Sequence, residues 1–393
     1  MKESRRARGF ALLLVLALTL AVPLRICGVI RPEGGASEAE AIALGTGIGV
    51  SAASAIVMEA ESGELLFEKD ADTRRPMAST TKIMTALVVV EEMVMDQTVA
   101  VPKAAVGVEG SSVYLVENER LTVEELLYAL MLESANDAAT ALAVLTAGSV
   151  ENFAVLMNRK AETLGLTNTA FENPHGLDGE GHYTTARDLA VLTAHALQNE
   201  TFRTIVSTCK RTIPLNGDQG TRVLVNHNRL LRSYEGCIGV KTGFTKRSGR
   251  CLVTAAERDG VTLVAVTLNA SDDWNDHRRM LDYGFDRLET VTLLDESGTI
   301  CVAPTVGGTV DHVQLYAAGP VTVTLPKDEH HVTTVYEMSR FYYAPIAEGQ
   351  VLGRLVWYDG DREIASQELM ALHGVEKRTE KTSLWEWFLS LFQ

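Results

Sequence analysis

Residues 76–87 read Pro-Met-Ala-Ser-Thr-Thr-Lys-Ile-Met-Thr-Ala-Leu, a serine and a lysine followed by an apolar run. This stretch predicts a helix that begins near Ser79. Residues three apart lie on one face of a helix, so Lys82 is expected beside Ser79. A serine hydroxyl needs an adjacent base to act as a nucleophile, and a lysine can serve when burial or a neighbouring cation lowers its pKa. Alone, the pair is also consistent with a helix-capping serine and a solvated lysine.

Two further motifs follow in order, Ser134-Ala135-Asn136 and Lys241-Thr242-Gly243, and each occurs once in the chain. A second Ser-x-x-Lys, at Ser207 and Lys210, has no Ser-x-Asn after it and precedes a polar stretch. Lys241 would lower the pKa of Lys82 if its strand runs alongside. Together the three motifs supply a nucleophile, a base, a proton relay, an amide anchor and a carboxylate clamp. A serine enzyme needs this set to cleave a peptide at its C-terminal residue.

This pattern resembles the penicillin-recognising serine acyl-transferases, and within them the low-molecular-mass penicillin-binding proteins, the serine-type D-Ala-D-Ala carboxypeptidases. The resemblance covers roughly residues 50–375. Lys246-Arg247-Ser248 follows the third motif at a place where the family varies freely. The matching segments are Met77 to Thr85, Glu133 to Ala139, Asn173 to Leu177, His182 to Asp188 and Gly239 to Thr245.

The resemblance implies a role for each matching residue. Ser79 would attack the carbonyl between two D-alanines, Lys82 would accept its proton, and Ser134 would relay a proton to the leaving amine. Backbone N–H groups of Ser79 and Phe244 would form the oxyanion hole, at a helix N-terminus that favours developing negative charge. The expected substrate-binding residues are Asn136 for an amide, Lys241 and Thr242 for the terminal carboxylate, and Gly243 and Phe244 beside them.

The implied reaction is removal of the terminal D-alanine from peptidoglycan stem pentapeptides, through an acyl-enzyme that penicillins and other β-lactam antibiotics would also form. No cofactor and no metal are expected. The sequence contains no Cys-x-x-Cys or His-x-x-x-His spacing. His175, His182 and the pair His330-His331 are better explained as structural or exposed residues than as zinc ligands.

Other functions use similar motifs. A class A β-lactamase needs a dedicated glutamate for deacylation, and no Glu-x-x-Leu-Asn lies between Ser134 and Lys241. A transpeptidase or an endopeptidase would use the same acyl-enzyme, and the motifs exclude neither. A non-catalytic penicillin-binding sensor or scaffold is disfavoured by the intact nucleophile, base and relay.

The predicted fold class is α+β. Alternating runs at 54–60 and 64–69 predict a hairpin, and helical patterns follow at 123–132, 137–145, 153–164 and 186–197. Strand patterns return at 236–242, 250–256 and 261–268, before a closing helix at 276–288. A penicillin-binding, β-lactamase-like transpeptidase domain is therefore expected, with one antiparallel sheet from both ends of the domain and a helical lobe inserted. Short Val- and Thr-rich runs from about residue 290 predict a small all-β sandwich.

The two ends of the chain carry separate signals. A basic start and the apolar run from Phe10 to Leu24 predict a secretory signal peptide, although a retained anchor would also fit. Trp385, Trp387 and Phe388 in a tail with a polar side predict an amphipathic helix on a membrane surface, or a helix docked on the core. The expected divisions are a signal peptide at 1–30, a linker at 31–50, a catalytic domain at 51–288, a β-sandwich at 289–375 and a membrane-anchor helix at 376–393.

Composition agrees with a secreted globular enzyme, and the two terminal signals with the resemblance imply a location at the outer face of the cytoplasmic membrane or in the cell wall. The chain has 393 residues, 46% of them hydrophobic, which is enough for more than one domain. Its net charge of -15 argues against nucleic acid as a partner. Cys237 and Cys251 flank the third motif and would reach each other across adjacent strands, but buried free thiols are the favoured interpretation.

Overall fold

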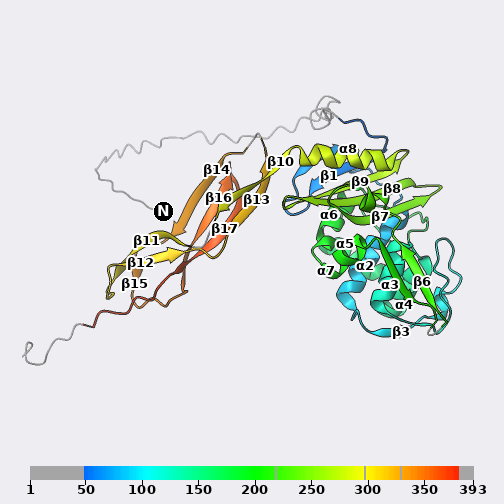
Figure 1. Ribbon diagram of the computed structural model, residues 1–393, viewed down its shortest axis with the longest axis horizontal. Coiled ribbons are helices and arrows are strands. Elements are labelled where there is room, and N and C mark those ends of the chain that lie inside the picture. The colour runs from blue at the N-terminus through cyan, green and yellow to red at the C-terminus, as the bar shows by residue number, and fades with distance from the viewer. Residues whose placement is uncertain (1–47, 217–218, 296–297, 328–329, 380–393) are drawn as a thin grey trace, which may run out of the picture.

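The computed structural model describes residues 48–216, 219–295, 298–327 and 330–379, which form a catalytic domain and a slender β domain extending from it (Figure 1). The expected signal peptide, most of the expected linker and residues 380–393 of the expected anchor helix lie outside the described residues. Residues 376–379 are described and are not helical.

The catalytic domain is built on a five-stranded antiparallel sheet in the order β2-β1-β9-β8-β7. As the sequence predicts, its strands come from both ends of the domain, and the helical lobe is inserted between them. All six residues of β1 are buried, because α8 covers one face of the sheet and the helical lobe covers the other (Figure 1). The strands are β1 (Ser54–Glu59), β2 (Leu65–Lys69), β7 (Cys237–Thr245), β8 (Gly249–Arg258) and β9 (Val261–Ala270).

The helical lobe packs an apolar core around α2 and α4. Thr122 and Glu125 form a capping box that starts α3: Thr122 Oγ1 accepts from Glu125 N, and Glu125 Oε2 accepts from Thr122 N. The helices are η1 (Ala78–Thr81), α2 (Lys82–Glu92), η2 (Lys103–Ala105), α3 (Val123–Leu132), α4 (Asn136–Ala147), α5 (Val150–Thr163), α6 (Ala186–Leu197), α7 (Glu200–Ser207) and η3 (Arg229–Arg232). Two small hairpins complete the lobe: β3 (Thr98–Ala100) with β4 (Arg120–Thr122), and β5 (Lys210–Pro214) with β6 (Thr221–Val225).

Three features differ from the sequence expectations. The helix α7 and the β5–β6 hairpin lie in a stretch where the sequence patterns predict no helix or strand. The second Ser-x-x-Lys is divided between them, and Ser207 Oγ donates only to Thr204 O. The closing helix α8 spans Asp273–Phe285, three residues earlier than expected, because Leu288 already belongs to β10 of the next domain.

The all-β character of the C-terminal domain is confirmed. A six-stranded sheet in the order β14-β16-β17-β12-β11-β15 and a two-stranded sheet β10-β13 enclose a separate core that includes Leu315, Trp357 and Leu369. At the junction with the catalytic domain, Arg362 Nη1 lies 3.1 Å from Glu64 Oε2. The strands are β10 (Leu288–Leu294), β11 (Thr299–Val306), β12 (His312–Tyr316), β13 (Val321–Pro326), β14 (Val332–Met338), β15 (Tyr342–Tyr343), β16 (Val351–Asp359) and β17 (Arg362–Ala371).

The two cysteines that flank the third motif cannot pair with each other. Cys251 lies opposite Gly243 in the β7–β8 ladder, whereas Cys237 lies opposite Ala256, five residues further along β8. At about 3.3 Å per residue this separation is roughly 17 Å, well beyond disulfide reach. Both thiols are free, and burial raises the pKa of each to about 11.

No single helix in the described part of the chain is long and apolar enough to cross a membrane. The pair α4 and α5 meets that test only when joined, and it is bent by 83°.

Candidate active site

Ser79 lies in the short helical turn η1 that leads directly into α2. The residue before it, Ala78, has a left-handed φ of 48°, which turns the chain sharply into the helix. A Cβ atom at Gly176, itself at φ 89°, would come within 1.9 Å of Ala78 O. The segment around Gly176 therefore packs directly against the turn that presents the serine, and this close approach requires glycine.

Lys82 is fully buried one turn after the serine. Its Nζ lies 2.9 Å from Ser79 Oγ, 2.8 Å from Asn136 Oδ1 and 2.6 Å from the carbonyl oxygen of His175. Burial, followed by the nearby charge of Lys241, lowers the pKa of Lys82 well below its ordinary value. The structure thus brings Ser79 and Lys82 together as the sequence predicts, and it adds the His175 carbonyl, which the sequence motifs do not include.

The segment from Asn173 to His182 packs against the turn η1 and the start of α2. Thr85 Oγ1 donates to Pro174 O at 2.6 Å, and His182 Nε2 lies 2.7 Å from Thr81 Oγ1. Because His182 Nδ1 accepts from a backbone N–H, its Nε2 carries the proton and donates to Thr81. Burial lowers the pKa of His182 to about 4, so this histidine stays neutral and structural.

Asn136, the third residue of the second motif, bridges Lys82 to the loop before α3. Its Oδ1 accepts from Lys82, its Nδ2 donates to Glu109 O at 2.6 Å, and its backbone N donates to Ser111 O at 2.7 Å. Ser134, two residues earlier, has a left-handed φ of 58° and lines the same cleft as Ser79.

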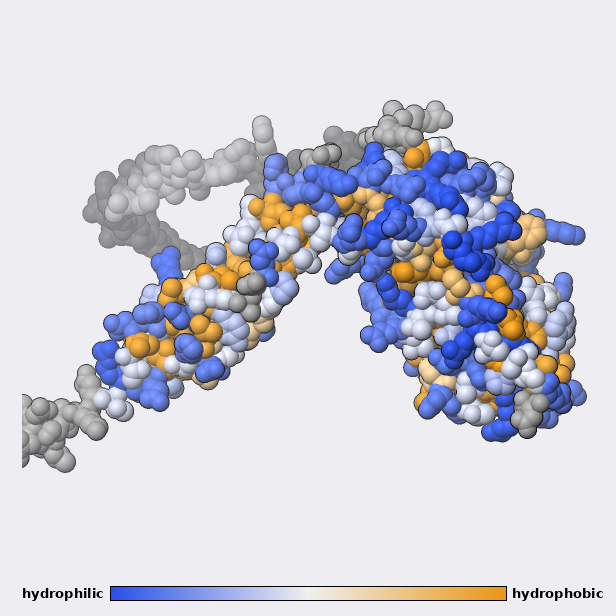
Figure 2. Space-filling model, in the orientation of Figure 1, coloured by the Kyte–Doolittle hydropathy of each residue, from blue (hydrophilic) through white to orange (hydrophobic). Residues whose placement is uncertain are grey.

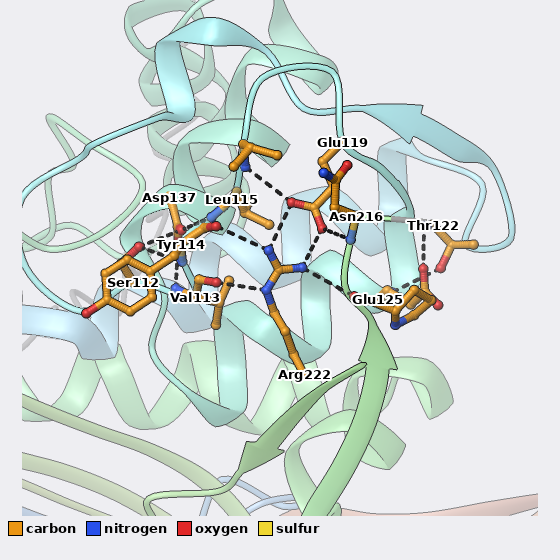
Figure 3. A network of polar contacts seen from close by, with 12 residues as sticks. Ser112, Val113, Tyr114, Leu115, Glu119, Thr122, Glu125, Asp137, Asn216 and Arg222 are labelled. Carbon is orange, nitrogen blue, oxygen red and sulfur yellow. Dashed lines mark hydrogen bonds and ion pairs between the residues drawn. The ribbon is translucent and has the colours of Figure 1, made fainter. Parts of the chain in front are cut away.

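The loop that carries Ser111 is held from two sides by buried polar groups (Figure 3). On one side Asp137, next to Asn136, accepts from Ser112 Oγ at 2.6 Å and from Leu115 N at 3.0 Å. On the other side Arg222, from β6, donates to Val113 O at 2.8 Å and forms an ion pair with Glu119. The side chain of Glu119 is fully buried and that of Arg222 is 10% exposed, so the pair is largely shielded from water.

The strand β7 lies close to the nucleophile turn on the other side of the cleft. A Cβ atom at Gly243 would come within 3.1 Å of Ser79 N, so any other residue here would push the strand and the turn apart by a few tenths of an ångström. Thr242, Gly243 and Phe244 line the cleft, whereas Lys241 is buried behind it, and its Nζ donates to Thr242 O at 2.9 Å. Burial lowers the pKa of Lys241 to about 7.

The cleft has a volume of about 510 Å³. Six of its lining residues were not predicted from the sequence to lie there: Ser111, His227, Arg250, Cys251, Asp273 and Trp274. They come from the loop before α3, the segment after β6, the start of β8 and the start of α8. Arg250 lies opposite Phe244 in the β7–β8 ladder, and its Nη2 donates to Asp273 Oδ1 at 2.5 Å. His227 Nε2 lies 3.2 Å from Glu133 Oε2.

Alternative kinds of site in the described residues would be a second hollow and a metal site. A larger hollow of about 730 Å³ lies around β2, between Ile48 and Thr73, and contains none of the motif residues. Among the described residues, no group of three His, Cys, Asp or Glu side chains is arranged to hold a metal ion.

A serine hydrogen-bonded to a buried lysine, at the junction of a helical lobe and an antiparallel sheet, is typical of the penicillin-recognising serine acyl-transferases. Residues 40–272 match the family model described as D-alanyl-D-alanine carboxypeptidase, and residues 288–377 match the C-terminal domain of penicillin-binding protein 5. The chain belongs to the D-alanyl-D-alanine carboxypeptidase family, the low-molecular-mass penicillin-binding serine peptidases that act in peptidoglycan maturation.

Similar proteins span most of the chain. The D-alanyl-D-alanine carboxypeptidase DacF of Bacillus subtilis is 33% identical, over 83% of this chain and 86% of its own length. DacC of Escherichia coli is 32% identical, over 86% and 87%. Penicillin-binding protein 5 of Haemophilus influenzae superposes with a TM-score of 0.66 at 30% identity, covering 84% of this chain and 99% of that one. The Streptomyces K15 DD-transpeptidase superposes with a TM-score of 0.58 at 36% identity, covering 61% and 99%.

Proposed function

We propose that Ser79 attacks the carbonyl carbon of the D-Ala-D-Ala bond and that Lys82 is the base that removes its proton. The contacts of Lys82 support this assignment. A neutral amine has two N–H groups and one lone pair, and Asn136 Oδ1 and the His175 carbonyl are both acceptors. When these two oxygens take the N–H groups, the lone pair is left for the hydroxyl proton of Ser79, 2.9 Å away.

The acyl-enzyme forms when Ser79 Oγ bonds to the carbonyl carbon and the terminal D-alanine leaves as an amine. Ser134 relays the proton from Lys82 to that amine, and its position in the cleft beside Ser79 supports the role. Backbone N–H groups of Ser79 and Phe244 stabilise the oxyanion, a role favoured by the close approach of β7 at Gly243. Water then hydrolyses the ester, by attack that regenerates the serine.

Substrate binding is assigned to the strand β7 and its surroundings. Thr242 donates to the terminal carboxylate, and Lys241 supplies positive potential from behind the strand. Arg250 adds an exposed guanidinium at the same end of the cleft, oriented by Asp273. Asn136 holds a substrate amide with the second N–H of its Nδ2, since the first is used by Glu109 O.

The single observation that carries the proposal is the set of three contacts around Lys82 Nζ. The decisive experiment incubates the protein with a stem pentapeptide and analyses the products. Release of D-alanine, lost in Ser79→Ala together with labelling by a fluorescent penicillin, is the expected result. Labelling that persists in Ser79→Ala, or that moves to Ser207, would overturn the assignment.

A transpeptidase is the second candidate, because the K15 enzyme that resembles this catalytic domain bears that name. The same incubation tests it with an added amine acceptor, such as a second peptide with a free side-chain amine. Because both reactions release D-alanine, the products that separate them are the tetrapeptide and the cross-linked dimer, and dimer in excess of tetrapeptide would favour transpeptidation over carboxypeptidation.

We further propose that the enzyme is exported and attached to the outer face of the cytoplasmic membrane by residues 380–393. The basic start with an apolar run, and a tail containing Trp385, Trp387 and Phe388, support this location. A mature protein cut after Lys377 should stay active on soluble peptide and stop sedimenting with anionic vesicles. Loss of folding in the cut protein would instead mean that the tail belongs to the core.

A further inference from the structure

Four apolar side chains are exposed at the end of the β domain farthest from the catalytic domain. This distal patch consists of Val306, Val310, Phe341 and Tyr343, whose exposed fractions run from 44% to 70%. Val306 pairs with Tyr343 in the parallel β11–β15 contact, and the rings of Phe341 and Tyr343 lie edge to face with centroids 5.4 Å apart. Figure 2 shows hydrophobic residues among hydrophilic ones in this part of the molecule.

The described chain ends beside the distal patch. Lys377 forms a bridge with Gly308, and Arg378 N donates to Gly307 O at 2.8 Å, so the last residues run along the turn between Val306 and Val310. From Thr379 to Leu384 there are five residues, which span at most ~18 Å when fully extended. Any surface that takes the aromatic tail therefore comes within that distance of Thr379.

We propose that the distal patch is a membrane-contact surface that enters the interfacial layer of the bilayer alongside the tail. This inference rests on the proposed attachment through residues 380–393. Aromatic rings with a polar edge, such as that of Tyr343, are favoured at the boundary between water and lipid. When an exposed apolar cluster beside a lipid-binding segment enters the bilayer interface, its apolar surface is removed from water, which stabilises the bound state.

Charge around the distal patch is balanced, which separates its contribution from that of the tail. Arg340, Lys377 and Arg378 are basic, whereas Asp311 and Glu376 are acidic, and Arg378 Nη2 lies 3.4 Å from Asp311 Oδ1. The patch should therefore bind through its apolar side chains, with weak dependence on salt. Lys381, the one basic residue of the tail sequence, would add an attraction to anionic lipid that salt screens.

The test uses the mature chain from residue 31 and vesicles of equal parts phosphatidylcholine and phosphatidylglycerol. Phe341→Ser/Tyr343→Ser should lower the vesicle partition coefficient about tenfold, or ~1.4 kcal/mol, and leave D-alanine release from soluble peptide unchanged. The matched control is Val335→Ser/Tyr336→Ser, an aliphatic and aromatic pair on β14 that is 41% and 49% exposed but lies away from the chain exit. It should partition like the wild type.

A second measurement needs no substitution. Hydroxyl-radical footprinting of the wild type should show Phe341 and Tyr343 protected by vesicles while Tyr336 stays reactive. A wild type that ignores vesicles overturns the tail attachment and the patch together. A wild type that binds while the patch variant binds equally, with Phe341 unprotected, overturns the patch alone. An equal loss of vesicle binding in the patch and control variants would mean that the β domain lies flat on the bilayer. A wild-type dimer that the patch variant abolishes would mean that the patch mediates self-association. Either result overturns the proposal.

Discussion

The catalytic and β domains both contain antiparallel strands, but key charged side chains are buried in the catalytic domain and exposed in the β domain. In the catalytic domain β1 is buried along its whole length, and Lys82, Lys241 and Glu119 are held away from water. In the β domain β14 is exposed at most of its positions, and its ion pair, Arg354 with Glu337, lies open to solvent. Helices that cover both faces of the sheet exclude water from the interior of the catalytic domain. A lysine buried there loses its proton more readily than one in water.

The largest effect should come from removing the base inside that interior. Lys82→Ala should lower the rate of acylation by a penicillin by about 10²- to 10⁴-fold, the usual contribution of a general base. Stopped-flow measurement with a chromogenic cephalosporin provides the rate. Lys246→Ala, an exposed lysine beyond the third motif, is the control and should acylate normally. Normal acylation in Lys82→Ala would mean that another group is the base.

The two ion pairs give the most direct comparison of the domains. Arg222→Met leaves Glu119 buried without its partner and should cost about 3–5 kcal/mol of unfolding free energy, because an unpaired buried charge is strongly destabilising. Arg354→Met removes an exposed pair and should change the unfolding free energy far less, because water and salt screen the two charges. Calorimetry of both variants measures the difference. Similar losses of unfolding free energy in the two variants would contradict the contrast between the buried pair of the catalytic domain and the exposed pair of the β domain.

The loop held by Arg222 also predicts a change in activity. Ser112→Ala loses the bond to Asp137 and should loosen the loop whose Glu109 and Ser111 carbonyls position Asn136. Acylation should fall by about tenfold, or ~1.4 kcal/mol, with a smaller loss of stability than in Arg222→Met. An unchanged acylation rate would show that Asn136 is held by α4 alone.

The dry interior also predicts a pH profile. The pKa of Lys82 is lowered, so its neutral form prevails above that pKa, and acylation should rise with pH and then level off. Lys241 contributes to the lowering through its charge. Lys241→Met should therefore raise the pKa of Lys82 and move the acid limb of the acylation profile to higher pH. A limb that stays in place would mean that burial alone sets the pKa.

An effect as small as that of Ser112→Ala is expected at the carboxylate end of the cleft. Thr242→Val should weaken turnover of a peptide with a free terminal carboxylate by about tenfold, since one hydrogen-bond donor to a charged group is lost. The amidated peptide should be a poor substrate for the wild type and should change little in the variant. Equal cleavage of the free-acid and amidated peptides by the wild type would instead favour an endopeptidase.

The features that could be predicted from the sequence are those encoded by local patterns. The spacing of Ser79 and Lys82, the strand patterns of β1 and β9, and the helical pattern of α3 are all properties of neighbouring positions. The position of Arg250 in the cleft depends on the β7–β8 register, and the role of the His175 carbonyl depends on a backbone atom that no side-chain motif reports. The Arg222–Glu119 pair joins positions 103 residues apart, so no local pattern predicts it.

The pairing of β1 with β9 has a consequence for biogenesis. Glu59 lies opposite Leu263, so the central strand pair of the catalytic sheet forms only after about 200 further residues have followed. At 5–20 residues per second, a chain emerging in step with synthesis would wait roughly 10–40 s for that partner. Throughout that interval the apolar β1–β2 hairpin has an unpaired edge, which is a template for aggregation. Chaperones that hold extended chains should therefore matter most for this enzyme before residue 270 has emerged.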